Sequence, residues 1–128
     1  MDKNSNSLNW FEIPVTDLAR AKKFYESVFS VQLTDMGEMN GKTITSFPAE
    51  NGNGKASGGL VQSPAHKPSK DGAVIYLNAN PDIQPVIDRI ESSGGKVEVA
   101  KTLVNPEIGY TALFIDSEGN KVGLHAQN

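Results

Sequence analysis

The chain follows the same order of elements twice, and this repetition limits its fold more than any other feature. Each half predicts a strand, a helix and three further strands, with helix-capping aspartates at Asp17 and Asp82, about 65 positions apart. Sequence identity between the halves is negligible, so the repeat lies in the pattern alone. Two βαβββ units indicate an α+β domain in which helices cover one face of each sheet.

The first half begins with an alternating strand at 9–15. Phe11, Ile13 and Val15 should pack under a helix, whereas Trp10 and Glu12 should point the other way. The helix follows, with an apolar stripe at helical spacing made of Leu18, Ala21, Phe24, Tyr25 and Val28. Weaker strand patterns, separated by Gly/Asn turns, follow at 31–36, 42–47 and 56–62.

A polar, proline-rich connector at 64–72 separates module one, about 8–63, from module two, about 73–127. The second module predicts a strand at 73–78 and a helix from Asp82 through Ser93. Strands near 96–100, 110–116 and 121–126 complete it. We therefore expect one domain at 8–127, preceded by a disordered tail at 1–7.

Composition excludes several classes of protein. The 128 residues suffice for one domain with a real core, and they include no cysteine, which excludes disulfides, zinc–thiolate sites and thiol nucleophiles. The net charge is −3 with both signs interspersed, so no basic footprint for nucleic acid is present. No apolar run approaches the roughly 20 residues of a membrane span. We expect a soluble cytoplasmic protein that binds neither nucleic acid nor membrane.

Two motifs resemble the opening and closing segments of the vicinal oxygen chelate (VOC) superfamily, which includes glyoxalases, extradiol dioxygenases and bleomycin-resistance proteins. They are Val15-Thr-Asp-Leu-Ala-Arg-Ala-Lys-Lys-Phe-Tyr near the start and Phe114-Ile-Asp-Ser-Glu-Gly-Asn-Lys-Val-Gly-Leu near the end. The resemblance extends from Leu8 to Gln127. It implies two paired βαβββ modules whose sheets curl around a shared cavity, and a homodimer.

The resemblance also implies where a metal would bind. Metal-dependent relatives carry histidines at the positions that match Trp10 and Val74 (or Ala73), and a glutamate at the position of Gly123. The fourth ligand position falls near 59–61 and offers no carboxylate. Indole, aliphatic side chains and glycine provide no donor for a divalent cation. We therefore expect the fold and the cavity, with no metal or other cofactor and without the chemistry that a metal supplies.

Strand parity predicts which side chains turn away from the helices: Trp10, Glu12, Tyr76, Asn78, Phe114 and His125. Pairing of the modules would make this face the wall of a ligand-binding cavity, although such a face can also be exposed to solvent or form a dimer contact. His125 shares the face of Gly123, either as an acid/base partner of Glu12 or as a histidine whose hydrogen bonds are satisfied within the fold.

Glu12 is the candidate catalytic residue. Between Trp10 and Pro14 it would be partly desolvated, which would raise its pKa and suit it to act as a general base or to bind a cation. The alternative is a structural salt bridge to an Arg or Lys. Among the other polar residues, we expect His66 to be solvated, and Asp116 and Glu118 to serve turn geometry.

Three functions are open at this point. The first is a metal-free protein that binds a small aromatic or cationic molecule between the modules. The second is a glyoxalase- or dioxygenase-type enzyme, a lyase or oxidoreductase, that uses non-standard metal ligands or acid/base catalysis by Glu12. The third is an assembly module without a small-molecule pocket. Fold alone does not decide between them, and we favour the first.

Overall fold

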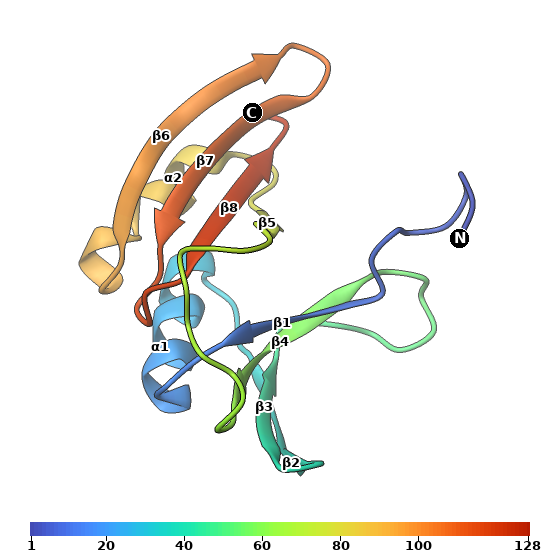
Figure 1. Ribbon diagram of the computed structural model, residues 1–128. Coiled ribbons are helices and arrows are strands. Elements are labelled where there is room, and N and C mark those ends of the chain that lie inside the picture. The colour runs from blue at the N-terminus through green and yellow to red at the C-terminus, as the bar shows by residue number, and fades with distance from the viewer.

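The computed structural model describes residues 1–128 and contains two four-stranded sheets with helices beside them (Figure 1). The first module consists of β1 (Trp10–Pro14), α1 (Leu18–Phe29), β2 (Thr34–Met39), β3 (Lys42–Ser46) and β4 (Ser57–Gln62). The second consists of β5 (Tyr76–Asn78), α2 (Ile83–Asp88), the 3-10 helix η1 (Glu91–Ser93), β6 (Lys96–Asn105), β7 (Gly109–Ile115) and β8 (Lys121–Ala126). The predicted α+β fold of two βαβββ modules is confirmed.

Both sheets have the same topology. The strand orders are β1-β4-β3-β2 and β5-β8-β7-β6, and in each sheet the first strand of the module runs parallel to the last one. The remaining neighbours are antiparallel. The two modules are therefore structural copies, and each sheet has its first strand at one edge and an antiparallel strand, β2 or β6, at the other.

Helix α1 packs against both sheets and so joins the two modules in one core. The ring centroid of Phe24 lies 6.1 Å from that of Phe114 on β7, while the ring of Tyr25 lies 5.4 Å from that of Phe47 after β3. The Tyr25 hydroxyl donates to Asp116 Oδ2 at 2.7 Å. Burial, with the neighbouring Asp116 carboxylate, raises the pKa of Tyr25 well above its ordinary value.

Two elements of the second module differ from the prediction in length. Helix α2 ends at Asp88, because the backbone N–H of Arg89 donates to Val86 O in a 3-10 pattern and a separate 3-10 turn continues to Ser93. Strand β6 continues to Asn105 along its long hairpin partner β7. Neither helix is long and apolar enough to cross a membrane.

Strand β5 is the shortest strand, with three residues in place of the six that were predicted. The backbone still follows β8 just before β5 begins, since Gly123 N–H donates to Ile75 O at 2.9 Å. The segment that leads from the connector into β5 therefore lies alongside β8. At its beginning, Ser69 O accepts a hydrogen bond from Lys121 N–H at 3.4 Å.

Candidate functional site

Glu12 lies at the centre of a polar cluster on the face of the first sheet that carries no helix. Trp10 Nε1 donates to Glu12 Oε2 at 3.2 Å, and Lys42 Nζ donates to the same oxygen at 2.8 Å. His66 Nε2 lies 3.0 Å from the other oxygen, Oε1. In the neighbouring strand β4 the residue opposite Glu12 is Gly59, which has no side chain to cover the carboxylate.

The predicted rise in the pKa of Glu12 is wrong. The hydrogen bond from Lys42 lowers the pKa of Glu12, and those from His66 and Trp10 add to this effect. Together they outweigh partial burial, which alone would raise the pKa. Glu12 is thus an ionised carboxylate at neutral pH, and the alternative of a salt bridge to a lysine is confirmed.

Sequence reasoning missed two members of this cluster. His66, which was expected to be solvated, has a side chain that is only 23% exposed and bonds to Glu12 and Ser63. Its position depends on the path of the connector, which carries no periodic signal. Lys42 was predictable, because alternation along β3 places it on the same face as Ile44. That face is also the face of Glu12, since Glu12 and Ser46 both pair with Gly59.

The prediction that Phe114 faces the cavity is wrong. Its side chain is completely buried and contacts Phe24 on the helix side of the second sheet, opposite the buried Val122. Strand β7 is apolar on both faces, with Leu113 and Ile115 alternating with Phe114. Alternation therefore identified two sets of residues without showing which set faces the helices.

Tyr76, Asn78 and His125 lie on β5 and β8, where the register pairs Tyr76 with Gly123 and Asn78 with His125. His125 Nε2 donates to the backbone oxygen of Ile108 at 2.7 Å, so His125 is a satisfied histidine within the fold. No hydrogen bond joins this group to Glu12. The structure thus brings the predicted site residues together in two groups, one on each sheet.

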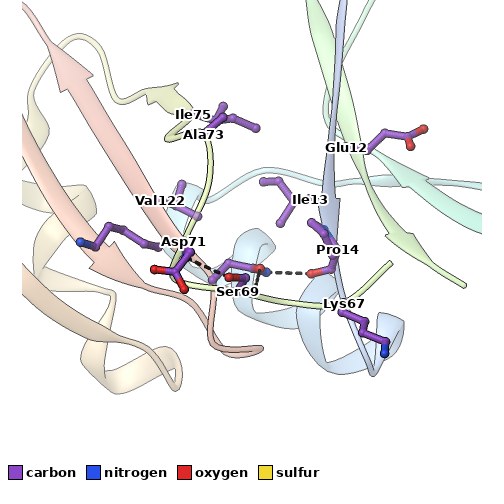
Figure 2. A pocket seen from close by; sticks show the side chains of 11 residues that line it. Glu12, Ile13, Pro14, Lys67, Ser69, Asp71, Ala73, Ile75 and Val122 are labelled. Atoms are coloured by element: carbon purple, nitrogen blue, oxygen red, sulfur yellow. Dashed lines mark hydrogen bonds between the residues drawn. The ribbon is translucent and has the colours of Figure 1, made fainter. Parts of the chain in front are cut away.

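One pocket, of about 260 Å³, lies where β1 and β8 meet the connector (Figure 2). The connector contributes Lys67 and Asp71 to its wall. Figure 2 shows the side chain of Ile13 pointing toward Val122, whereas the carboxylate of Glu12 points to the opposite side of β1. Glu12 is also one of the lining residues, but its carboxylate points away from Ile13 and Val122. The pocket is smaller than the roughly 300–1,000 Å³ of typical ligand sites.

A second pocket, of about 460 Å³, lies between the first sheet and β5. Nine of its twelve lining residues are hydrophobic and none is charged. Tyr76 and Asn78, two of the predicted ligand-binding residues, belong to it. The full lining is Leu8, Phe11, Phe29, Val31, Phe47, Pro48, Ala56, Ser57, Ile75, Tyr76, Leu77 and Asn78. We refer to this site as the aromatic pocket.

The residues at the family's metal-ligand positions do not fit a metal ion. The indole N–H of Trp10 already donates to Glu12, and Val74 is aliphatic. A Cβ atom at position 123 would stand 2.5 Å from a ring carbon of Tyr76, so the tyrosine ring occupies the space that a glutamate there would need. No group of three or more His, Asp or Glu side chains in residues 1–128 converges as metal ligands would.

Comparison with known proteins gives concordant results. The family model described as Glyoxalase/Bleomycin resistance protein/Dioxygenase superfamily matches residues 7–124. A glyoxylase-like domain-containing protein of Didymella fabae is 30% identical over 115 residues, which cover 88% of each chain. These matches extend over nearly the whole chain and both modules.

Solved structures show the same arrangement. A glyoxalase/bleomycin resistance protein from Streptomyces sp. CB03234 is 27% identical, with a TM-score of 0.64 and coverage of 93% of this chain and 99% of that one. Glyoxalase I from Zea mays, at 19% identity and a TM-score of 0.67, shares the fold; the match covers 92% of this chain and 43% of the maize chain. With its paired βαβββ modules and its family match, the chain belongs to the Glyoxalase/Bleomycin resistance protein/Dioxygenase superfamily.

Proposed function

We propose that this protein binds a small, uncharged aromatic molecule in the aromatic pocket, without a metal ion. The observation that carries the proposal is the lining of this pocket, which is mostly hydrophobic and has no charged side chain. Its volume of about 460 Å³ lies in the usual range of small-molecule sites. The pocket contains Tyr76 and Asn78 of the predicted ligand-binding residues, but Phe11 and Phe29 line it in place of the predicted Trp10 and Glu12.

The aromatic side chains of the pocket favour a planar ligand. The rings of Phe11 and Phe47 lie 5.7 Å apart between their centroids, and Tyr76 is 52% exposed beside them. Aromatic rings stack or meet edge to face at such distances, which adds to the free energy of burying apolar surface. Asn78, Ser57 and the hydroxyl of Tyr76 are the polar side-chain groups of the lining that could orient a ligand through a hydrogen bond.

A cationic ligand is not favoured, although the sequence left it open. The Glu12 carboxylate, which would have attracted a cation, already pairs with Lys42 at 2.8 Å and does not line the aromatic pocket. A cation would therefore have to displace Lys42 before it gained an ionic partner. We therefore propose an uncharged aromatic ligand.

The test uses N-phenyl-1-naphthylamine, an uncharged aromatic probe whose fluorescence rises in apolar sites. We expect saturable binding to the wild-type protein and a loss of at least about tenfold in affinity for Ala56→Trp, because the new indole fills the pocket. Ala100→Trp, on the exposed surface of β6, is the matched control and should bind as the wild type does. Equal binding by both variants, or no saturable binding, would overturn the proposal.

Metal analysis of protein purified without a tag or chelator tests the proposal that the protein binds its ligand without a metal ion. We expect no stoichiometric Ni, Mn, Fe, Zn or Mg, and no change in unfolding temperature on adding these ions, because Trp10, Val74 and Gly123 supply no donors. A stoichiometric metal would instead favour the alternative function, a glyoxalase- or dioxygenase-type enzyme with non-standard ligands.

A further inference from the structure

Three side chains beside the first sheet form a continuous hydrogen-bonded array outside the aromatic pocket. Glu12 Oε1 lies 3.0 Å from His66 Nε2, and His66 Nδ1 lies 2.7 Å from Ser63 Oγ. Glu12 comes from β1, while Ser63 and His66 come from the segment directly after β4. Carboxylate, imidazole and hydroxyl are thus in the order that activates a serine in nucleophilic catalysis.

Chemistry fixes the direction of the hydrogen bonds in this array. Glu12 is ionised, since its hydrogen bonds lower its pKa, and a carboxylate can only accept. His66 must therefore carry its proton on Nε2 when the ring is neutral, which leaves Nδ1 as an acceptor. The hydroxyl of Ser63 then donates to Nδ1, so that the imidazole is poised to take the serine proton.

Ser63 is also accessible. It lies in a turn in which His66 N–H donates to Ser63 O at 3.2 Å, and it lines an open depression of about 470 Å³. Thr16, Thr43 and Gln62 form part of the same wall. His66 lines the same depression, so a small substrate can reach the hydroxyl and the imidazole there without entering the aromatic pocket.

We propose that Ser63 is an acyl-accepting nucleophile, activated by His66 and positioned through Glu12, that cleaves activated esters of small carboxylic acids. Ser63 Oγ attacks the ester carbonyl carbon while its proton passes to His66 Nδ1. The ester C–O bond then breaks, and the leaving alcohol takes that proton. Water attacks the acyl-serine with His66 again as base, which releases the acid and restores Ser63. No redox step or further reactant is required.

A second serine provides a matched control for the ordinary structural role of Ser63. Ser63 Oγ accepts a hydrogen bond from Ala65 N–H at 3.1 Å, and Ser69 Oγ accepts the same kind of bond from Asp71 N–H at 2.9 Å. Such bonds stabilise turns. Ser69 differs in having no imidazole beside it, so reactivity that is confined to Ser63 cannot arise from the turn.

The first experiment treats the full-length protein with an alkyl fluorophosphonate and maps the modified serine by peptide mass spectrometry. We expect modification of Ser63 and not of Ser69, and unchanged modification in Ser69→Ala and in the pocket-filling Ala56→Trp. Equal reactivity of the two serines, or none at Ser63, would overturn the proposal even if Ser63→Ala failed to fold. Because Ala56→Trp removes only the aromatic pocket, this result is independent of the proposed function.

The second experiment measures hydrolysis of p-nitrophenyl acetate. Ser63→Ala should lose the initial burst of nitrophenol, and His66→Gln should lower kcat about 100-fold. Glu12 acts through His66, so Glu12→Gln should lower kcat by about tenfold or more while KM stays the same. A burst that persists in Ser63→Ala would overturn the assignment of the nucleophile.

Discussion

Glu118 joins the turn between β7 and β8 to the beginning of α1. Its Oε1 accepts hydrogen bonds from the backbone N–H groups of Thr16 at 3.0 Å and Asp17 at 2.9 Å, and Arg20 Nε donates to Oε2 at 2.7 Å. The Glu118 side chain is fully buried, although that of Arg20 is 54% exposed. Burial alone would raise the pKa of Glu118, but Arg20 and the backbone donors lower it to about 2. A residue expected to serve turn geometry thus caps a helix of the other module.

The depressed pKa of Glu118 predicts a pH-dependent contribution to stability. Glu118→Gln should lower the free energy of unfolding at pH 7 by about 2 kcal/mol, less than the whole pKa shift implies because Arg20 is half exposed. The contribution is fully present above the ordinary pKa of 4.5 and is lost as the pH falls toward about 2. Urea unfolding at pH 7 and pH 3 should show a smaller difference at pH 3, with the exposed Glu50→Gln as control. A difference that does not change with pH would contradict this account.

At the scale of elements, Asn120 ties together three segments that are distant in the sequence. Its Nδ2 donates to Pro14 O at the end of β1 at 2.7 Å and to Asp116 Oδ2 at 3.0 Å, and its Oδ1 accepts from Ser69 N–H in the connector at 3.0 Å. The side chain is only 5% exposed. The β7–β8 turn therefore fixes the end of β1 and the path of the connector.

Removal of this side chain should destabilise the junction of the modules. Asn120→Ala removes the hydrogen bonds to Pro14 O and Ser69 N–H and leaves the buried Asp116 carboxylate without one of its donors, so we expect a loss of about 2–4 kcal/mol. Asn53→Ala removes one local bond in an exposed loop, to Lys55 N–H, and should cost less than about 1 kcal/mol. Chemical unfolding of both variants measures the loss in the free energy of unfolding. Equal losses would show that Asn120 does not stabilise the junction of the modules more than an exposed asparagine stabilises its loop.

The elements with a single apolar face were predictable from the sequence. Strand β1 and helix α1 have one, so parity placed Ile13 in the core and Trp10 and Glu12 on the other side. Strand β7 is apolar on both faces, and for that reason Phe114 was assigned to the wrong one. The partners of Glu12 and the aromatic pocket depend on how the modules and the connector meet, which no local pattern records.

At the scale of the whole molecule, the free edge of the second sheet exposes several large apolar side chains. Strand β6 has ten residues and no strand on its outer side. Val99, Leu103 and Val104 along it are 43–50% exposed, and Ile108 in the following hairpin is 47% exposed. Long apolar edge strands tend to pair with another chain unless they are covered. We therefore retain the expectation of a homodimer and propose this edge as its contact.

Light scattering coupled to size-exclusion chromatography tests the homodimer. The wild-type protein should elute with twice the mass of the chain, and Val104→Lys should shift it toward the monomer, because it places a charge on the β6 edge. Met36→Lys introduces the same charge on the edge strand of the first sheet, at a residue that is 45% exposed, and should leave the dimer intact. A monomeric wild type, or dissociation by Met36→Lys alone, would contradict the proposal.

The contact between Tyr76 and the backbone of Gly123 imposes an order on sequence change. A side chain at position 123 would collide with the tyrosine ring, whereas a smaller residue at position 76 would first open the space. The effects of the two substitutions are therefore not additive. A carboxylate at position 123 should therefore be better tolerated after position 76 has changed to a smaller residue than before that change.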